Sequence, residues 1–417
     1  MMADVLIVGA GPAGLAAARV LRVRGIERVV VADREAAGGG TPRHCVHTGF
    51  GARDLGRVMQ GPNYARRCVQ AAAAAGADVS CYATVTSLSP AAGATGPGAW
   101  EATLTTPDGL QAVTAGAVLL ATGCRERPRA ARLVPGDRPG SGVLTTGELQ
   151  QRVYVGGERL PGRALVVGAE HVSFSAMLTL VHAGADVVAL VTELPRHSSF
   201  GAFKFAAALR WRVPIWTSTV VERVIGRGRL TAVELRDATT GAVRLVDCET
   251  LVFSADWVAD YELARLAGAR VDPASRGVAV DTTLRTSVPG LFAAGNLVHP
   301  AETADVAALG GRHAGWHIAK ALIAGGPQEP GVPVLVQAPL AWISPSAIAA
   351  DGTPPPRRRF VLRATEFRPH ATIEVRQDDL LLARTRARLV PGRSLSLNAS
   401  WIPKVHANRG PVRVFTR

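Results

Sequence analysis

The chain has 417 residues, a formal net charge of +14 and 47% hydrophobic residues. This length predicts two or three folded domains, and the apolar content excludes a disordered chain. No apolar run reaches the roughly 18 residues of a transmembrane helix, and no basic segment precedes the apolar start. We therefore expect a cytoplasmic protein without a membrane span.

Arginine supplies most of the positive charge, because the chain has only three lysines, Lys204, Lys320 and Lys404. Nucleic-acid binding would need a basic stripe interleaved with aromatic residues, and only 5% of the residues are aromatic. We expect no nucleic-acid partner. The arginines are expected to form solvated surface, with a docking face for an acidic protein as the alternative.

The first predicted element is a buried parallel strand over residues 5–8, which is too short to be a helix. Gly9, Gly11 and Gly14 follow with G-x-G-x-x-G spacing, and residues 15–21 have helical spacing. Gly9 permits a tight turn, Gly11 lets the backbone approach a pyrophosphate, and Gly14 lets the helix pack against its strand. The free N–H groups that begin the helix would then bind a diphosphate.

A second strand over residues 29–32 ends at Asp33, which lies 19 residues after Gly14. An acidic side chain at this distance accepts hydrogen bonds from a ribose. The order of strand, glycine turn, helix, strand and acid predicts a dinucleotide-binding unit. A glycine turn that packs without a ligand is the alternative.

A long, polar, glycine-rich loop occupies residues 34–67 together with the start of a helix, and such a length is unusual for a plain connector. The pattern then predicts a helix at 66–76, strands at 79–88 and 100–106, and a buried strand at 117–120 that ends in Ala121, Thr122 and Gly123.

A second dinucleotide-type unit begins at residues 164–167 and Gly168. Its further predicted elements are a helix at about 173–183, a strand at 186–191 that leads to Glu193, a helix near 203–210 and a strand at 251–254. The chain then returns to the first unit with a strand and turn at 286–296 and a helix at 305–322. Short strands are predicted at 360–364, 372–376, 380–383 and 412–415.

The glycine turn, the Ala121-Thr122-Gly123 strand end, the inserted unit and the later Phe292-Ala-Ala-Gly295-Asn296 turn occur in one order. In this respect the chain resembles the flavoproteins with two dinucleotide-binding domains, which include the pyridine nucleotide–disulfide oxidoreductases. The resemblance covers about residues 3–325 and implies FAD as the cofactor. The positions that we assign to FAD on this basis are Gly9, Gly11, Pro12, Ala13, Gly14, Asp33, Arg34, Gly40, Val85, Ala121, Thr122, Gly123, Gly295, Asn296, Asp305 and Val306.

We therefore predict an α/β fold with a Rossmann-like FAD-binding domain, an inserted NAD(P)-binding-like domain and a small β-rich C-terminal domain. The predicted boundaries are 1–149 and 256–328 for the discontinuous FAD domain, 150–255 for the inserted domain and 329–417 for the C-terminal domain. In the family that the chain resembles, the helix after the late turn points its N-terminus at the flavin pyrimidine ring. The positive end of the helix dipole stabilises negative charge there.

A narrower resemblance rests on the segments 43–51, 61–65 and 124–129. These segments are similar to a bacterial branch that includes the flavin subunits of opine oxidase and hydrogen cyanide synthase. This resemblance implies that the partner is a separate dehydrogenase or electron-acceptor subunit.

Two motifs depart from the family pattern. Asn296 stands where the family usually has Asp, and its amide can still hydrogen-bond a ribityl hydroxyl. In the second unit, Glu170 and Ser173 stand where the second and third glycines would be. Repulsion between a carboxylate and a phosphate at ~4 Å is on the order of 4 kcal/mol per charge pair before screening. This argues against NAD(P)H binding, although Glu193, 20 residues after Ser173, is placed as a ribose acid would be.

The candidates for chemistry lie in the glycine-rich loop, which the resemblance places close to the flavin ring. His44 and His47 have the chemistry of proton carriers, and Arg43 could hold a substrate carboxylate. The alternative is that all three only fold the loop or contact the cofactor. The five cysteines lack C-x-x-C spacing, which argues against an iron–sulfur cluster, a structural zinc site and a redox-active disulfide; we predict no metal site.

These observations predict an FAD-dependent oxidoreductase that takes electrons from a small amine, amino acid or hydroxy acid, or from a partner dehydrogenase subunit, and passes them on. An NAD(P)H-dependent reductase of a small acceptor is the first alternative. The second is a non-catalytic subunit that holds FAD and docks a partner.

Overall fold

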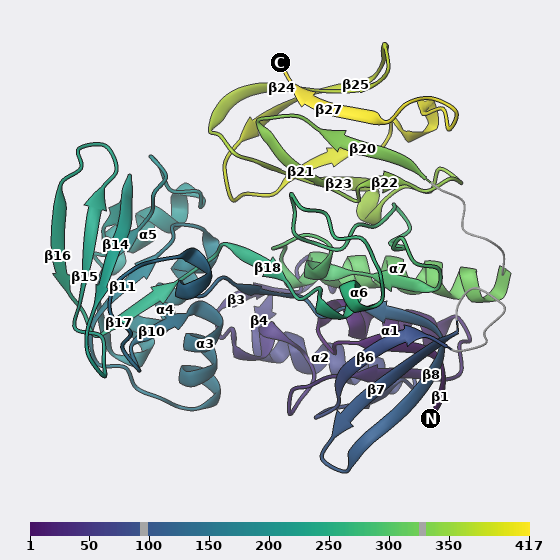
Figure 1. Cartoon of the computed structure of the whole chain (residues 1–417), viewed down its shortest axis with the longest axis horizontal. Helices are drawn as coiled ribbons and strands as arrows, with labels where there is room; N and C mark the ends of the chain where they lie inside the picture. The colour runs from purple at the N-terminus through teal and green to yellow at the C-terminus, as the bar shows by residue number, and fades with distance from the viewer. Residues whose placement is uncertain (92–98, 325–330) are drawn as a thin grey trace. The chain divides into compact units, whose positions relative to one another are not determined.

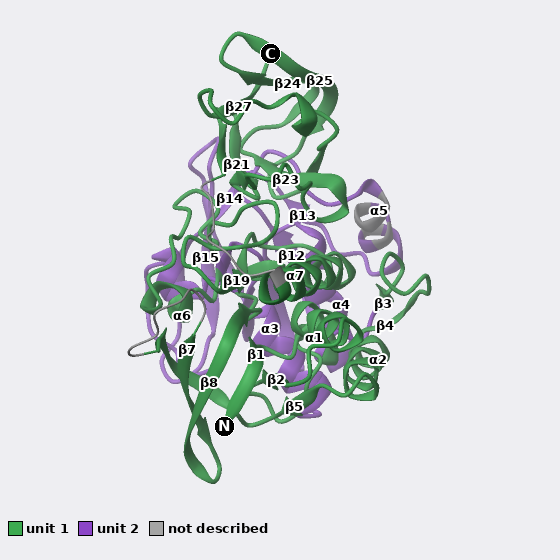
Figure 2. Cartoon of the chain, turned by 90° about the vertical axis from the view of Figure 1, so that its right-hand side faces the viewer, with its two compact units in different colours: residues 1–43, 48–124, 259–417 green, residues 44–47, 125–258 purple. Residues whose placement is uncertain are grey.

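The computed structural model describes residues 1–91, 99–324 and 331–417. The helices and strands are labelled in Figure 1, and Figure 2 shows the two compact units into which the chain divides. Unit 1 comprises residues 1–43, 48–124 and 259–417, and unit 2 comprises residues 44–47 and 125–258. Within the described ranges, no helix is long and apolar enough to cross a membrane.

Unit 1 is built on a mostly parallel sheet with the strand order β5-β2-β1-β8-β7-β6, and β19 also pairs with β8. The central strands are apolar on both faces, as expected where helices cover a parallel sheet. The long strand β8 pairs in parallel with β1 and β19 through its C-terminal part and antiparallel with β7 through its N-terminal part. The strands are β1 (Met2–Val8), β2 (Val29–Ala32), β5 (Asp78–Ser80), β6 (Thr84–Pro90), β7 (Trp100–Thr106), β8 (Gly109–Leu120) and β19 (Leu291–Ala293).

Helices α1 (Pro12–Val23) and α7 (Ala304–Ala324) pack closely against each other through small residues. A Cβ added at Gly311 of α7 would overlap the carbonyl oxygen of Ala13, and one at Gly315 would lie 2.8 Å from the carbonyl oxygen of Ala17. Only glycine therefore permits this separation between the two backbones. The contact ties the last long helix to the helix that follows the first glycine turn.

Unit 2 contains a parallel sheet with the order β10-β17-β11-β12-β13. Alternate residues of β11 face opposite sides: Ala164 and Val166 pack with α4 (His171–Ala183), whereas Leu165 packs with the antiparallel strands β14–β16. The elements of this unit are β10 (Val143–Thr145), α3 (Thr146–Gln150), β11 (Gly162–Val167), α4, β12 (Ala185–Val191), α5 (Gly201–Arg210), β13 (Ile215–Trp216), β14 (Thr219–Ile225), β15 (Ala232–Asp237), β16 (Val243–Asp247) and β17 (Thr250–Phe253).

The C-terminal part of unit 1 is a pair of β-sheets with orders β22-β20-β27-β24-β25 and β21-β23-β26. They share one apolar core, in which the rings of Phe360 and Trp401 stack with centroids 5.3 Å apart. The strands are β20 (Val332–Val336), β21 (Leu340–Ser344), β22 (Ala347–Ile348), β23 (Arg359–Ala364), β24 (Arg368–Gln377), β25 (Leu380–Leu389), β26 (Leu395–Asn398) and β27 (Val412–Thr416). The short helix η5 (Pro356–Arg358) packs on α7 (Figure 1).

The predicted α/β class, the two Rossmann-like sheets and the β-rich C-terminal region are confirmed. One predicted strand is wrong in detail: residues 79–88 form two strands, because Tyr82 adopts a positive φ of 54° between them. The helix predicted at 66–76 is α2 (Gly61–Ala74), which begins earlier because Pro62 suits a first helical turn. The domain boundaries stay a prediction.

Gly311→Ala should destabilise unit 1 by about 3 kcal/mol, because the new methyl group forces α1 and α7 apart. Gly310→Ala is the matched control, since its Cβ would meet no atom closer than 3.9 Å and alanine favours helix. Thermal unfolding of the two purified variants measures the difference. Equal unfolding midpoints would show that the helix contact does not limit stability.

Candidate functional site

The first glycine turn joins β1 to α1 and is made of backbone contacts. Gly9 has a φ of +107°, and a Cβ there would lie 2.5 Å from the carbonyl oxygen of Ala121. A Cβ at Gly14 would overlap the carbonyl oxygen of Gly9. Both glycines are required by the protein itself, because a side chain at Gly9 would collide with the end of β8 and one at Gly14 would push α1 away from β1.

Gly11 differs from its neighbours because a Cβ there would meet nothing within 4 Å. Its φ of −77° and ψ of −179° are also accessible to other residues, so neither packing nor conformation of the chain explains a glycine here. The first turn of α1 contains no acidic residue, and Pro12 begins the helix. This arrangement leaves N–H donors and a positive helix end open to an anion.

The glycine-rich loop runs directly beside this turn. The N–H of Gly39 donates to the carbonyl oxygen of Ala10 (2.7 Å), and a Cβ at Gly40 would lie 2.9 Å from the Cα of Gly11. The loop residue Gly40, predicted to lie at the cofactor, is thus beside the first glycine turn.

Asp33 follows β2 at the carboxyl edge of the sheet and is buried. Its carboxylate accepts hydrogen bonds from the N–H of Ala10 (2.6 Å) and of Glu35 (2.9 Å). The sequence did not reveal this second task of Asp33, which is to hold the glycine turn. A carboxylate has about four acceptor sites, so two bonds leave capacity for ribose hydroxyls.

The residues that follow β8 are hydrogen-bonded to Asp260, in the segment where the chain returns to unit 1. The Thr122 hydroxyl donates to the carbonyl oxygen of Asp260 (2.7 Å), and the N–H of Asp260 donates to the carbonyl oxygen of Gly123 (3.0 Å). Arg34 lies 3.6 Å from the Asp260 carboxylate. Val85 is buried in β6. Apart from Val85, these predicted cofactor residues lie at the carboxyl edge of one sheet, where open α/β sheets bind ligands. Val85 pairs with Leu104 of β7, which in turn pairs with Gln111 near the start of β8.

The late turn, η4 (Gly295–Leu297), brings Gly295 against α1: a Cβ there would lie 2.8 Å from that of Ala13. The Asn296 amide makes two bonds to the backbone of Glu302, accepting from its N–H (2.9 Å) and donating to its carbonyl oxygen (3.2 Å). Asn296 thus closes the loop that leads to α7, a task that we did not predict.

Asp305 and Val306 lie in the first turn of α7. Asp305 is buried and accepts a hydrogen bond from the N–H of Arg53 (3.1 Å), with the Arg53 guanidinium 3.8 Å away. Asp305 thus ties the loop at Arg53 to the first turn of α7, where its negative charge is favourable to the helix dipole.

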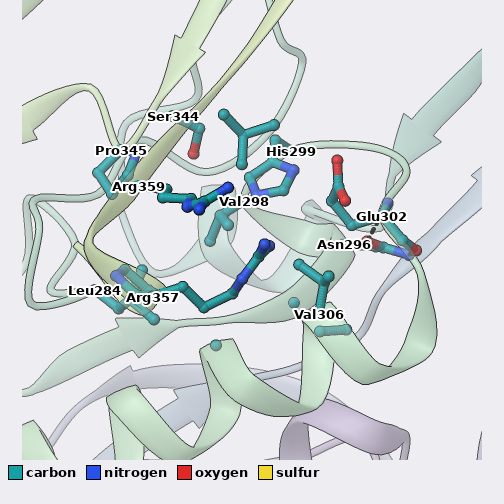
Figure 3. Close-up of a pocket in the computed structure, with 15 residues that line it drawn as sticks. Leu284, Asn296, Val298, His299, Glu302, Val306, Ser344, Pro345, Arg357 and Arg359 are labelled. Atoms are coloured by element: carbon teal, nitrogen blue, oxygen red, sulfur yellow. Dashed lines mark hydrogen bonds between the residues drawn. The ribbon is translucent and has the colours of Figure 1, made fainter. Parts of the chain in front are cut away.

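A small pocket of about 40 Å³ lies between η4, the start of α7 and the C-terminal strands (Figure 3). Asn296, His299, Glu302, Arg357 and Arg359 are its polar lining residues with long side chains. Burial raises the pKa of Glu302, whereas Arg363, Arg357 and Arg53 oppose this shift. The Glu302 carboxylate accepts a hydrogen bond from the hydroxyl of Ser394.

The second glycine turn, in unit 2, has a different chemistry. Gly168 keeps the positive φ of +131°, but Glu170 is the N-cap of α4. Glu170 and Ser173 form a reciprocal capping pair, in which the Ser173 hydroxyl accepts from the Glu170 N–H (3.2 Å). The helix start that would face a diphosphate therefore carries an acidic residue of the chain.

The predicted catalytic residues divide between the units. His44 and His47 belong to unit 2 by their contacts, His44 buried and His47 exposed. Arg43 belongs to unit 1 and is held by its own loop, because it donates to the carbonyl oxygen of Ala37 and lies 3.5 Å from the Glu35 carboxylate. This favours the structural role for Arg43.

Residues 3–323 match the family model "Pyridine nucleotide-disulphide oxidoreductase". The chain belongs to this family. Thioredoxin reductase of Treponema pallidum is 28% identical over 297 residues, which cover 70% of this chain and 88% of the relative. An opine oxidase subunit of Agrobacterium tumefaciens is 32% identical over 193 residues, covering 45% of this chain and 37% of that protein.

Solved structures of this family share the fold. Thioredoxin reductase of T. acidophilum has a TM-score of 0.66 at 22% identity and covers 77% of this chain and 99% of its own. Bacillithiol disulfide reductase Bdr of Bacillus cereus has a TM-score of 0.60 at 17% identity, with 77% and 99% covered.

FAD is the cofactor that this family implies, and the residues of unit 1 fit it. The open position at Gly11, the start of α1 without an acid and the Asp33 carboxylate suit the diphosphate and ribose of a dinucleotide. The protein is an FAD-dependent oxidoreductase. Within the described residues, no group of His, Cys, Asp and Glu could hold a metal ion.

Gly11→Ala should leave the stability of the FAD-free protein unchanged and weaken FAD binding by about tenfold or more, because only the cofactor needs this close approach. FAD titration and thermal unfolding of stripped protein measure the two effects. Gly14→Ala is the contrast, since its Cβ overlap should lower stability even without FAD. Normal FAD affinity in Gly11→Ala would contradict the assignment.

The His299 imidazole should make unit 1 less stable in acid. Burial, together with the Arg363 guanidinium, lowers the pKa of His299 from its ordinary value of 6.5 to about 3. Between these values the unfolded chain binds a proton that the folded chain does not, so the free energy of unfolding falls as pH is lowered from 6.5. His299→Gln should reduce the slope by up to about 1.4 kcal/mol per pH unit.

Urea unfolding between pH 7 and 5 measures this slope. His370→Gln is the control, because His370 is exposed on β24. An unchanged slope in His299→Gln would show that His299 is protonated in the folded state.

Proposed function

We propose that this protein is a dehydrogenase that uses FAD to oxidise a small amine, amino acid or hydroxy acid and passes the electrons to a partner or acceptor subunit. The observation that carries this proposal is the acidic start of α4, where Glu170 replaces a glycine of the dinucleotide motif. The helix that follows the first glycine turn presents only the positive end of its dipole, whereas the helix that follows the second begins with the Glu170 carboxylate. Only the first helix start therefore suits a diphosphate.

A pyridine nucleotide would bring its diphosphate to the start of α4. The Glu170 carboxylate opposes this by electrostatic repulsion, on the order of 4 kcal/mol for a close pair before screening. Arg132 is within electrostatic range of Glu170 and offsets part of the charge. Its guanidinium is already engaged, because it donates to the carbonyl oxygens of Ser254 (3.0 Å) and Ala255 (2.6 Å).

The cysteines do not support disulfide reduction. All five are free thiols, and burial raises the pKa to about 12 for Cys45 and Cys248 and to about 11 for Cys68. A protonated thiol is a poor nucleophile, because the thiolate is the reactive form. The Cys45 thiol also lies 3.3 Å from the side-chain oxygen of Gln150, as expected for a structural role.

The opine oxidase relative supports a substrate of the amino-acid type and a partner subunit. FAD, when bound, supplies a hydride acceptor. The chain's own contribution is to bind the dinucleotide at α1, to direct the positive end of α7 toward negative charge, and to hold the substrate. His44 and His47 remain our proposed proton carriers, with Arg43 as a less favoured carboxylate ligand.

The second candidate function is an NAD(P)H-dependent reductase of a small acceptor. The thioredoxin reductase relative and the exposed Glu193 after β12 favour it. A non-catalytic subunit that holds FAD is the third, and it would show activity only after a second chain is added.

Anaerobic titration of the purified holoprotein separates these functions. We expect the flavin absorbance to persist with micromolar NADH or NADPH and to bleach with an amino or hydroxy acid. Replacing both Glu170 and Ser173 with glycine should tighten NADH binding by about 100-fold, because the repulsion is removed. Rapid bleaching of the wild-type flavin by micromolar NADH would refute the proposal and support the reductase.

A further inference from the structure

The pocket at the start of α7 is lined by residues from two parts of unit 1 that lie far apart in the sequence. Asn296, His299 and Glu302 come from the segment that leads into α7, and Arg357 and Arg359 come from η5 and the start of β23. Figure 3 shows the Arg357 side chain extending from η5 toward Val298 and Val306. The C-terminal region thus forms one wall of a pocket whose other wall is the predicted flavin-facing helix end.

Arg357 is held in an unusual backbone conformation. Its φ is 59° and that of Arg358 is 54°, so two consecutive arginines adopt the left-handed region that normally favours glycine. Non-glycine residues in this region persist where the surrounding structure imposes them, and they are frequent at ligand sites. Here the turn aims the first of the two side chains into the pocket.

The Arg357 guanidinium makes no hydrogen bond and no ion pair with the described residues. Its strongest acidic neighbour is Glu302, whose carboxylate already accepts a hydrogen bond from the Ser394 hydroxyl. Arg363 and Arg53, in contrast, are engaged: Arg363 donates to the carbonyl oxygen of Ala301 (2.9 Å), and Arg53 lies beside Asp305. Arg357 is therefore a cation with its donors available on the pocket side.

His299 adds a second available polar atom. Its Nδ1 is buried and has no hydrogen-bond partner among the described residues, and its ring stacks on Trp342 with centroids 5.8 Å apart. The low pKa of His299 keeps the imidazole neutral. The ring can therefore form a hydrogen bond with a ligand N–H or O–H group and adds no charge to the pocket.

We propose that this pocket binds the carboxylate end of an α-amino or α-hydroxy acid, with Arg357 paired to the carboxylate and His299 hydrogen-bonded to the α-amino or α-hydroxyl group. This proposal deepens the proposed function and rests on it for the substrate class. A planar guanidinium matches a carboxylate with two parallel hydrogen bonds. The volume of about 40 Å³ admits the small polar end of a substrate and leaves its side chain outside.

Arg357→Met tests the carboxylate contact, and Arg358→Met is the matched control. Both changes remove one positive charge from the same left-handed turn, but only Arg357 lines the pocket. The probes are the protein amino acids, glycolate, lactate and malate, each compared with its amide. Binding is followed by the change in flavin absorbance of the oxidised holoprotein, and FAD content is measured for each variant.

We expect Arg357→Met to raise the dissociation constant of the tightest acid by about 10- to 100-fold and to leave binding of its amide unchanged. Arg358→Met should bind both ligands as the wild type does. Equal affinities in the two variants, or no binding of any acid to the wild type, would overturn the proposal. Loss of FAD from Arg357→Met alone would also overturn it, because the pocket would then belong to the cofactor.

The two proposals fail in different ways. Acids that bind through Arg357 without bleaching the flavin anaerobically would refute the dehydrogenase function and leave the carboxylate site standing. Acids that bleach the flavin equally well in Arg357→Met would refute the site and leave the function standing.

Discussion

Close contact between backbones at the start of α1 is the constraint on which the rest of unit 1 depends. Gly9 lets the turn pack on the end of β8, Gly14 lets α1 pack on β1, and Gly311 brings α7 onto the same helix. Among the described residues, no side chain caps the N–H groups that begin α1. The same packing that stabilises the fold therefore leaves donors available for a diphosphate.

The two Rossmann-like sheets of the chain show that fold and binding chemistry are separate properties. Both contain a strand, a turn with a positive-φ glycine and a helix. The first helix begins with Pro12 and no acid, whereas the second begins with Glu170. The scaffold persists in unit 2 because its strands keep their apolar faces, while a single carboxylate changes which ligands the helix end favours.

The sequence pattern predicted those elements that depend on interactions between residues close together in the chain. Residues 29–32 and 100–106 form strands with the predicted limits, because the first is a buried apolar run and the second has buried residues at every other position. The strand that contains Pro333 escaped prediction, since its pairing with β22 and β27 comes from distant segments. In the same way, the bond that Ala10 donates to Asp33 depends on tertiary packing, because the two residues lie 23 positions apart.

No sequence pattern predicts the left-handed turn at Arg357, because arginine rarely adopts a positive φ. Only the structure shows that it lines the same pocket as His299 and Glu302.

Because two regions of the chain line the pocket, a change in the C-terminal wall is separate in evolution from a change in the FAD-binding part. In the N-terminal part, Gly9 and Gly14 meet the packing demands of the fold, and Gly11 and Asp33 are positions that we assign to FAD. The β-sheets after residue 331 carry none of the positions that we assign to FAD, yet one of their turns forms a pocket wall. A lineage could therefore exchange that turn, or the whole C-terminal sandwich, and acquire a new preference among small molecules while its redox machinery stays as it was.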